Sequence, residues 1–510
     1  MMADLEYLSL NAAQRFFYRI KKGFITFGRG FVNFFKRIPS YLLKLLKALG
    51  AVFHTPYYYF RYGDWKTRLS FLIWGFSNFA HKQWLRGILF SLFEIGVGLY
   101  IGLFGGHFLV RLGTLGTISP QSVVDPRGVP RGYFDNSFQI LLFGIFTLVV
   151  IITAVFVFYS NIKQAYELYI SAQINKKISD SKEDLRQVGN KNYHKTLLAF
   201  PMLGLVVFTV IPLIFMICVA FTNYDSLHYP PNELFGWVGM ENFAELINAG
   251  GAVGGDSVRF ASTFGKILGW TFIWAFIATF SCFIFGIILA LIINKKGIRL
   301  KKLWRNILIV TIAVPQFISL LLMSKMLRSS SDMQGIYNTI FMAMGLQPIN
   351  FLTDGTIAKV TVLMVNLWVG VPFTVLSVSG ILMNIPEDLY EAARIDGANP
   401  YAMFMKITMP YILFVMGPSL ITTFVGNINN FNVIYLLTNG GGPFPTGAEA
   451  MASGAGETSL LITWLYSLTV SDAKYGIASA IGIIVFVICA LLSLIVYSRS
   501  SSFKNEEDFQ

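Results

Sequence analysis

Residues 197–222 read LLAFPMLGLVVFTVIPLIFMICVAFT, a run without any Lys, Arg, Asp or Glu. A bilayer's hydrocarbon core is about 30 Å thick, and about 20 apolar helical residues cross it. Seven further stretches have a similar length and composition, so the sequence predicts an all-α polytopic membrane protein with about eight transmembrane helices. The eight stretches are residues 88–110, 137–160, 197–222, 267–293, 306–324, 360–384, 411–433 and 475–498.

The composition of the whole chain agrees with insertion into a membrane. Of its 510 residues, 55% are hydrophobic and 13% are charged, and the mean hydropathy is +0.59. Soluble domains carry about 25% charged residues, so a soluble globular protein is excluded as a class. The three cysteines, Cys218, Cys282 and Cys489, all lie in apolar runs. This placement indicates packing residues and no disulfide framework.

Basic residues are distributed unequally between the two sides of the predicted spans. If the N-terminus lies inside, the segments on that side carry 31 of the 40 Lys and Arg residues, and the other side carries 9. The positive-inside rule therefore predicts a multi-pass protein of the cell membrane with both termini in the cytoplasm. The net charge of +13 reflects this bias, and we expect no nucleic-acid partner.

The first 87 residues are basic and rich in phenylalanine. Arg15, Lys22, Arg29 and Lys36 recur every seven residues, and phenylalanines fill many positions between them. A helix with this pattern lies in the interface of a membrane. We therefore expect amphipathic interfacial helices in residues 1–87, most simply as an anchor on the membrane surface.

The chain lacks the motifs of catalytic, metal and nucleotide sites. The fragment nearest to a phosphate-binding GxxxxGK[ST] loop, Gly265-Lys266, is followed by Ile267. The five histidines are scattered, and no HExxH, GxSxG or CxxC occurs. We therefore expect a protein that is not an enzyme and holds no metal. Glu94 is the only acid deep in a predicted span, and it leaves two alternatives open, an ion-coupled secondary transporter or a structurally paired carboxylate.

Residues 386–410 read PEDLYEAARIDGANPYAMFMKITMP and separate the sixth and seventh predicted spans. Pro386, followed by two acidic residues, predicts the start of a helix, and Gly397 predicts its end. After a turn, a second short helix is expected to run to Pro410. A short cytoplasmic helix with small residues on one face is typical of a segment that docks into a groove on a partner.

The spacing of Glu391-Ala392-Ala393, Gly397 and Ile407-x-Met409-Pro410 resembles the EAA loop of bacterial ABC-importer permeases. In that family the loop forms the coupling helix that the ATPase subunit grips. Three further stretches, Asn366 to Phe373, Asn427 to Phe431 and Leu436 to Pro443, resemble the MalF-type permeases of maltose and maltodextrin importers, in their Gram-positive version. The resemblance implies ATPase-coupling roles for Glu391, Ala392, Ala393, Asp396, Gly397, Ile407 and Pro410.

Uncharged amides in the spans suit a neutral sugar, because amides bind hydroxyl groups without net charge. Asn427 and Asn430 are three residues apart and share a helix face, although interhelical hydrogen bonding is an alternative role for each. The resemblance implies sugar contacts at Asn366, Val369, Gly370, Phe373, Thr423, Gly426, Asn427 and Asn430. Phe373 and Gly426 depart from the Tyr and Phe of the maltose permease, which leaves the sugar and its chain length open.

The resemblance covers roughly residues 197–500 and implies an ATP-driven importer that works by alternating access. The implied partners are a second permease subunit, which the resemblance favours as a different chain over a second copy, two ATP-binding subunits that hold ATP and Mg, and an extracellular sugar-binding lipoprotein. The implied cargo is maltose or maltodextrin, with another oligosaccharide or sugar derivative as the alternative. The expected regions are an interfacial region 1–87, two accessory spans and a basic loop in 88–196, a permease core of six spans in 197–498 and a cytoplasmic tail 499–510.

Overall fold

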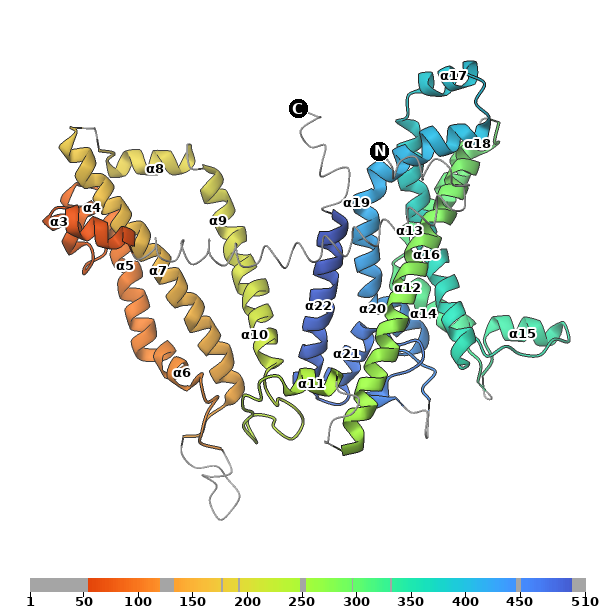
Figure 1. The fold of residues 1–510 in the computed structure, drawn as a ribbon, viewed down its shortest axis with the longest axis horizontal. Helices are drawn as coiled ribbons and strands as arrows, with labels where there is room; N and C mark the ends of the chain where they lie inside the picture. The colour runs from red at the N-terminus through yellow and green to blue at the C-terminus, as the bar shows by residue number, and fades with distance from the viewer. Residues whose placement is uncertain are drawn as a thin grey trace, which may run out of the picture. The chain divides into compact units, whose positions relative to one another are not determined.

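The computed structural model describes residues 54–119, 133–175, 178–190, 193–247, 254–295, 297–330, 333–445 and 451–497. The regular elements in these ranges are all helices, which confirms the predicted all-α fold (Figure 1). They form two compact units, unit 1 (Met1–Trp237) and unit 2 (Val238–Gln510). The predicted interfacial helix around Arg15 and Lys36, and the tail 499–510, lie outside the described residues.

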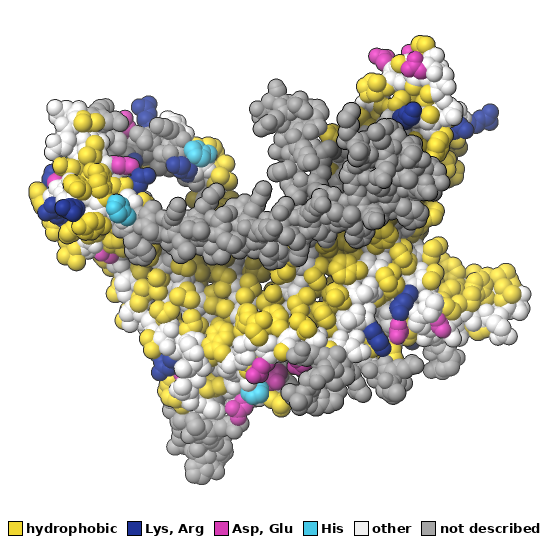
Figure 2. Space-filling view, in the orientation of Figure 1, with side chains coloured by type: hydrophobic (Ala, Val, Ile, Leu, Met, Phe, Trp, Pro, Cys, Tyr) yellow, Lys and Arg dark blue, Asp and Glu magenta, His cyan; other side chains and the backbone are white. Residues whose placement is uncertain are grey.

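The described residues contain seven helices that are long and apolar enough to cross a membrane, or eight if one bent pair counts as a span. This number confirms the prediction of about eight spans. Hydrophobic side chains cover the surface of these helices in Figure 2, as expected for contact with lipid. The seven helices are Trp84–Arg111, Ser137–Gln173, Tyr193–Val219, Phe260–Asn294, Gly355–Met383, Pro400–Thr438 and Tyr475–Leu494.

The predicted fifth span, residues 306–324, is a bent pair and not one straight helix. Helix α13 (Lys301–Ala313) ends before Pro315, and α14 (Gln316–Met326) begins after it. The two helices are bent by 90° relative to each other. Val314 has extended backbone angles, φ −75° and ψ 125°, because the ring of a following proline disfavours the helical region.

The described residues of unit 1 include three apolar helical spans and several short helices. The first span consists of α5 (Trp84–Tyr100), a π-helical turn over Ile101–Gly105, and α6 (Gly106–Arg111). The second is α7 (Ser137–Gln173), against which α6 packs, and the third runs from α9 (Tyr193–Leu205) into α10 (Ile211–Val219). The short helices α3 (Trp65–Leu69) and α4 (Phe76–Ala80) precede α5, and α8 (Ser181–Gly189) lies between α7 and α9.

Buried polar groups hold α3 and α4 against α5 and α7. Asn161 of α7 donates from Nδ2 to the Ser70 carbonyl at 2.8 Å and accepts from the Gly75 N–H at 2.8 Å. Glu94 accepts from the Trp74 N–H at 2.8 Å. The one acid deep in a predicted span therefore satisfies a backbone donor of the α3–α4 segment, which supports its structural role over a coupling ion site.

A buried carboxylate joins the two ends of the connection between α6 and α7. Asp135 is fully buried and accepts from the backbone N–H groups of Thr117 and Ile118 at 2.9 and 3.1 Å and from the Tyr133 hydroxyl at 3.0 Å. Arg111 lies 3.3 Å from its Oδ1. Burial alone would raise the pKa of Asp135, but these hydrogen bonds and the Arg111 charge outweigh it and lower the pKa below its usual value.

Unit 2 is built around α12 (Gly254–Asn294), which packs along α16 (Gly355–Met383) and α19 (Met409–Ile428). Their common core contains Phe283 and Ile287 of α12, three valines of α16, and Ile412 of α19. Helix α22 (Tyr475–Tyr497) packs against α19. The shorter helices are α11 (Glu241–Ile247), α15 (Ile336–Ala343), α17 (Glu387–Ile395), α18 (Pro400–Met403), α20 (Phe431–Thr438) and α21 (Leu461–Val470).

Candidate functional site

The predicted coupling helix is α17, and both of its predicted ends are confirmed. Pro386 is the N-cap residue, and Glu387 and Asp388 occupy the first turn, where their charges favour the helix dipole. The helix ends at Ile395 with Asp396 as its C-cap, and the next residue, Gly397, has a φ of +77° in the left-handed region. The Gly397 N–H donates to the Arg394 carbonyl at 3.0 Å, and the next N–H donates to the Ala393 carbonyl at 2.9 Å, which closes the last turn.

Helix α17 is exposed along its length. It contains no buried residue, and it projects at the upper end of unit 2 beyond α16 and α18 (Figure 1). Ile395 is 88% exposed and Leu389 is 48% exposed, while acidic side chains lie beside apolar ones on the same element (Figure 2). The helix is therefore accessible along its whole length.

The second half of the loop differs from its prediction. Helix α18 begins after Asn399, whose side chain accepts from the Ala402 N–H at 2.7 Å. A π-helical turn, Phe404–Thr408, then leads directly into α19. The predicted end of a second helix at Pro410 is wrong, because the helix continues through the π-helical turn into α19, and Pro410 lies within this continuous run.

The seven predicted coupling residues fall into two groups. The first five, Glu391 to Gly397, lie together on α17 and its last turn, whereas Ile407 and Pro410 lie where the loop enters α19. One hydrogen bond joins these two parts of the loop, because the hydroxyls of Tyr390 on α17 and Thr408 lie 2.8 Å apart. Glu391, Ala392, Asp396, Gly397 and Pro410 are exposed, and Ala393 and Ile407 are half-buried.

Most of the predicted sugar contacts line a small cavity between α12, α16 and α19, called here the asparagine cavity. Its volume is about 170 Å³, and no charged side chain lines it. Five of the eight predicted residues line it, namely Asn366, Gly370, Phe373, Thr423 and Asn427. The others in its wall are Ala278, Thr279, Cys282, Phe283, Thr374, Met416, Ser419 and Leu420.

Both buried asparagines of this cavity bond to α12. The Asn427 side chain donates from Nδ2 to the Thr279 hydroxyl at 2.9 Å, and its backbone carbonyl accepts from the indole N–H of Trp274 at 3.1 Å. Asn366 donates to the Cys282 sulfur at 3.8 Å, and sulfur is a weak acceptor. The asparagines therefore serve as interhelical links in this conformation, and the Asn366 amide holds the weaker of the two bonds.

Two of the lining residues lie where the cavity opens. The Phe373 side chain is 66% exposed, and Thr423 is also exposed. Gly370 has a packing role, because a Cβ there would lie 2.8 Å from the Cys282 sulfur. A glycine at this position lets α16 approach α12 closely.

Three of the predicted sugar contacts do not line the asparagine cavity. Val369 is half-buried, and Gly426 is exposed with open space where a Cβ would lie. Asn430 donates from Nδ2 to the Asn427 Oδ1 at 3.3 Å, and its own Oδ1 accepts from the Val433 N–H at 3.3 Å. Asn430 is thus the N-cap of α20 and joins that helix to Asn427.

Sequence reasoning missed the contribution of α12 to this cavity. Thr279 and Cys282 are three residues apart and Gly286 follows four residues later, so all three share one helix face. A stripe of small and weakly polar residues within an uncharged span was the available signal, since such residues form helix interfaces in membranes.

Comparison with known proteins identifies the family. Residues 282–501 match the family described as "Binding-protein-dependent transport system inner membrane component". The chain is 35% identical over 436 residues to the galactooligosaccharides transport system permease protein GanP of Bacillus subtilis, which covers 85% of this chain and 97% of GanP. The chain belongs to this family of inner membrane permeases. It is also 35% identical over 454 residues to the maltodextrin transport system permease protein MalC of Streptococcus pneumoniae, covering 87% of this chain and 97% of MalC.

The permease also aligns with a solved structure, that of a bacterial ABC transporter involved in the import of the acidic polysaccharide alginate. This alignment has a TM-score of 0.47 and 20% identity, and it covers 62% of this chain and 97% of the other. The family assignment rests on the sequence relatives. The chain is therefore a multi-pass permease subunit of an ABC importer and not an enzyme, and its resemblance to the MalF-type permeases is confirmed at the level of the family.

Proposed function

We propose that this permease imports oligosaccharides of the maltose and maltodextrin type through the asparagine cavity. The observation that carries the proposal is the lining of this cavity, which combines amide and hydroxyl groups with aromatic rings and contains no charge. Such groups bind the hydroxyls and the apolar faces of a neutral sugar. The transport of maltodextrin by MalC and of galactooligosaccharides by GanP, as their names state, supports the same class of cargo.

The cavity must enlarge to hold its cargo. Ligand pockets have volumes of about 300–1,000 Å³, whereas the asparagine cavity has about 170 Å³. Its open edge carries Phe373 and Thr423, where a second permease subunit can complete the wall. A sugar hydroxyl can replace Thr279 as the partner of the Asn427 amide, and such an exchange of one hydrogen bond for another has a small net free energy.

The energy for this change comes through α17. We infer that two ATP-binding subunits bind ATP and Mg, that α17 docks into a groove on one of them, and that this chain holds no cofactor itself. Closure of the ATPases moves α17, and the hydrogen bond between Tyr390 and Thr408 transmits this motion to the start of α19. The membrane orientation follows, with α17 and both termini in the cytoplasm and an extracellular sugar-binding lipoprotein on the opposite side.

Uptake by cells tests the cargo. Labelled maltose, maltodextrin and galactooligosaccharide are supplied to cells that lack this gene and to cells in which wild type or Asn427→Ala restores it. We expect loss of maltodextrin uptake on deletion, and rescue by wild type but not by Asn427→Ala. Asn350→Ala, which changes an exposed asparagine outside the cavity, is the matched control and should rescue fully.

Undiminished maltodextrin uptake in the deletion strain, where no second importer exists, contradicts the cargo. Rescue by wild type for galactooligosaccharide alone assigns that class of sugar instead.

A further inference from the structure

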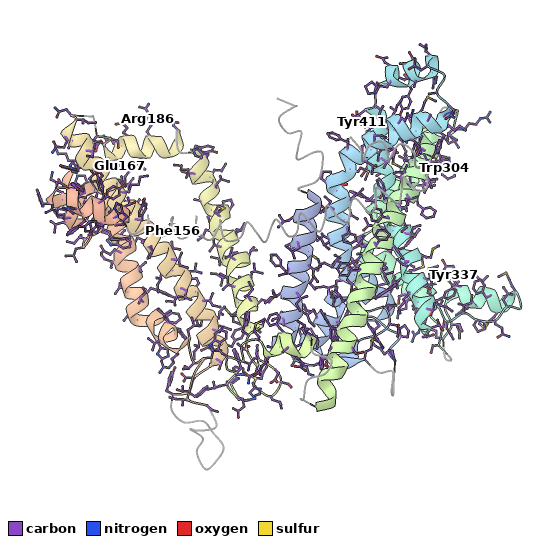
Figure 3. All side chains as sticks on the ribbon, viewed as in Figure 1. Phe156, Glu167, Arg186, Trp304, Tyr337 and Tyr411 are labelled. Carbon is purple, nitrogen blue, oxygen red and sulfur yellow. The ribbon has the colours of Figure 1, made fainter. Side chains whose placement is uncertain are left out.

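A second and larger cavity lies at the end of unit 2 remote from α17, and we call it the distal cavity. Helix α17 follows the end of α16 and precedes α19, whereas α20 begins where α19 ends. Figure 3 shows the same separation, with Tyr411 of α19 near the end that bears α17 and Tyr337 of α15 towards the other. The distal cavity has a volume of about 760 Å³ and lies between the last turns of α14, the last turns of α20 and the loop 439–444.

The distal cavity combines aromatic rings with hydrogen-bonding groups. Tyr435 and Phe444 line it. The Tyr435 ring stacks on Phe431 with ring centroids 4.7 Å apart, so its position is fixed, and Phe444 is 48% exposed. Ser324 donates from its hydroxyl to the Leu437 carbonyl at 3.0 Å, and the oxygen of that hydroxyl remains an acceptor for a ligand.

The charges of the distal cavity are all positive. Lys325 and Arg328 line it, and no acidic side chain does. Both are exposed, and the ion pairs within the described residues include neither of them. Together an ammonium group and a guanidinium group offer eight N–H donors, and hydroxyl oxygens of a sugar are acceptors for them.

Helix α20 connects the two cavities. Asn430 caps its first turn and bonds to Asn427 of the asparagine cavity, and its last residues, Tyr435 to Thr438, line the distal cavity. An eight-residue helix is about 12 Å long. The two cavities therefore lie at opposite ends of one short, rigid element.

We propose that the distal cavity binds the part of an oligosaccharide chain that the asparagine cavity cannot hold, a proposal that rests on the proposed function. Its volume falls within the usual range of ligand pockets and that of the asparagine cavity does not. The rings of Tyr435 and Phe444 pack against sugar faces, and Lys325 and Arg328 donate to sugar hydroxyls. The distal cavity thereby favours longer chains over a disaccharide.

Uptake of two sugars of different length tests this site. The concentration dependence of maltose and maltoheptaose uptake is measured in the deletion strain carrying wild type, Arg328→Ala, Tyr435→Ala, Tyr435→Phe or Lys266→Ala. Lys266 is an exposed lysine that does not line the distal cavity. Loss of a hydrogen bond to a charged donor costs about tenfold in affinity. We therefore expect Arg328→Ala to raise the half-saturating maltoheptaose concentration about tenfold. Tyr435→Ala, which removes a ring that packs on a sugar face, should also raise it, and maltose uptake should stay unchanged in both variants.

A conservative variant at the site and a control variant outside it separate loss of binding from a general loss of function. Tyr435→Phe keeps the ring face and should retain maltoheptaose uptake, and Lys266→Ala should behave as wild type. Equal losses for maltose and maltoheptaose in Arg328→Ala and Tyr435→Ala, or no loss for either sugar, overturn the distal site while the proposed function stands. If wild type imports neither sugar, the proposed function fails and the distal site fails with it.

Discussion

Replacement of Gly397 by valine tests whether the end of α17 matters for coupling. The φ of +77° at this residue lies in the left-handed region, and no heavy atom lies within 4 Å of the place where a Cβ would stand. The effect of a side chain here is therefore conformational and not a clash with neighbours. A non-glycine residue in this conformation costs about 1–2 kcal/mol, which lowers the population of the correctly ended helix by a factor of roughly 5–30.

Sugar uptake and ATP hydrolysis of the assembled importer are measured for Gly397→Val, Gly397→Ala and Gly397→Asn. Asparagine enters the left-handed region more readily than other residues with a side chain, so uptake should decrease in the order glycine, asparagine, alanine, valine. ATP hydrolysis should respond less than uptake, because the lesion lies in the link between the two. Equal uptake by the valine and asparagine variants refutes the conformational reasoning, and full uptake by the valine variant refutes the coupling role of this turn.

Three further predictions concern packing and charge, and each is measured as thermal unfolding of the purified full-length chain. Gly370→Ala should destabilise the protein by about 1–3 kcal/mol because the added Cβ meets the Cys282 sulfur. Cys282→Ala in the same chain should restore most of the lost stability, and an unaltered Tm in Gly370→Ala counts against the contact. Thr279→Val should lower the free energy of unfolding by about 1–3 kcal/mol because it leaves the buried Asn427 amide without an acceptor. Thr279→Ser keeps the hydroxyl and should behave as wild type. Equal stability of the two variants would contradict this hydrogen bond. The pKa of Asp135 is lowered in the folded protein. The carboxylate therefore stabilises the fold at pH values above its usual pKa near 3.8, and this stabilisation is lost as the pH falls through the lower pKa of the folded state. Asp135→Asn should remove this part of the pH dependence, and an identical pH profile in the variant would show that Asp135 does not cause it.

Much of the fold could be read from the sequence because its signals are local. A long uncharged apolar segment is stable in a bilayer as a helix, so the membrane spans were predictable without tertiary information. Pro386 and Gly397 act within one turn of α17, and the predicted ends of that helix are those observed. Proline was less informative inside the spans. Pro315 separates two helices, whereas Pro410 is accommodated in the first turn of α19, and only the surrounding packing decides between these outcomes.

The candidate site was predictable in part for a related reason. Asn366 and Asn427 stand out because amides are rare in apolar spans, and both line one cavity. Thr279 contributes through a hydrogen bond across 148 positions of the chain, and a single sequence carries no record of such a pairing. The distal cavity is lined by α14, α20 and the loop 439–444, and a single sequence does not specify how these separate segments come together.

The exposure of α17 has a consequence for the life of the subunit before assembly. Ile395 is 88% exposed, and in the proposed assembly it presents an aliphatic side chain to water until an ATP-binding subunit docks on α17. Exposed apolar side chains of this kind promote aggregation and recognition by proteases. We expect a permease without its ATP-binding subunits to be degraded quickly in the cell. The supply of ATP-binding subunits would then limit the number of assembled importers, and the exposure of Ile395 would distinguish unassembled from assembled permease.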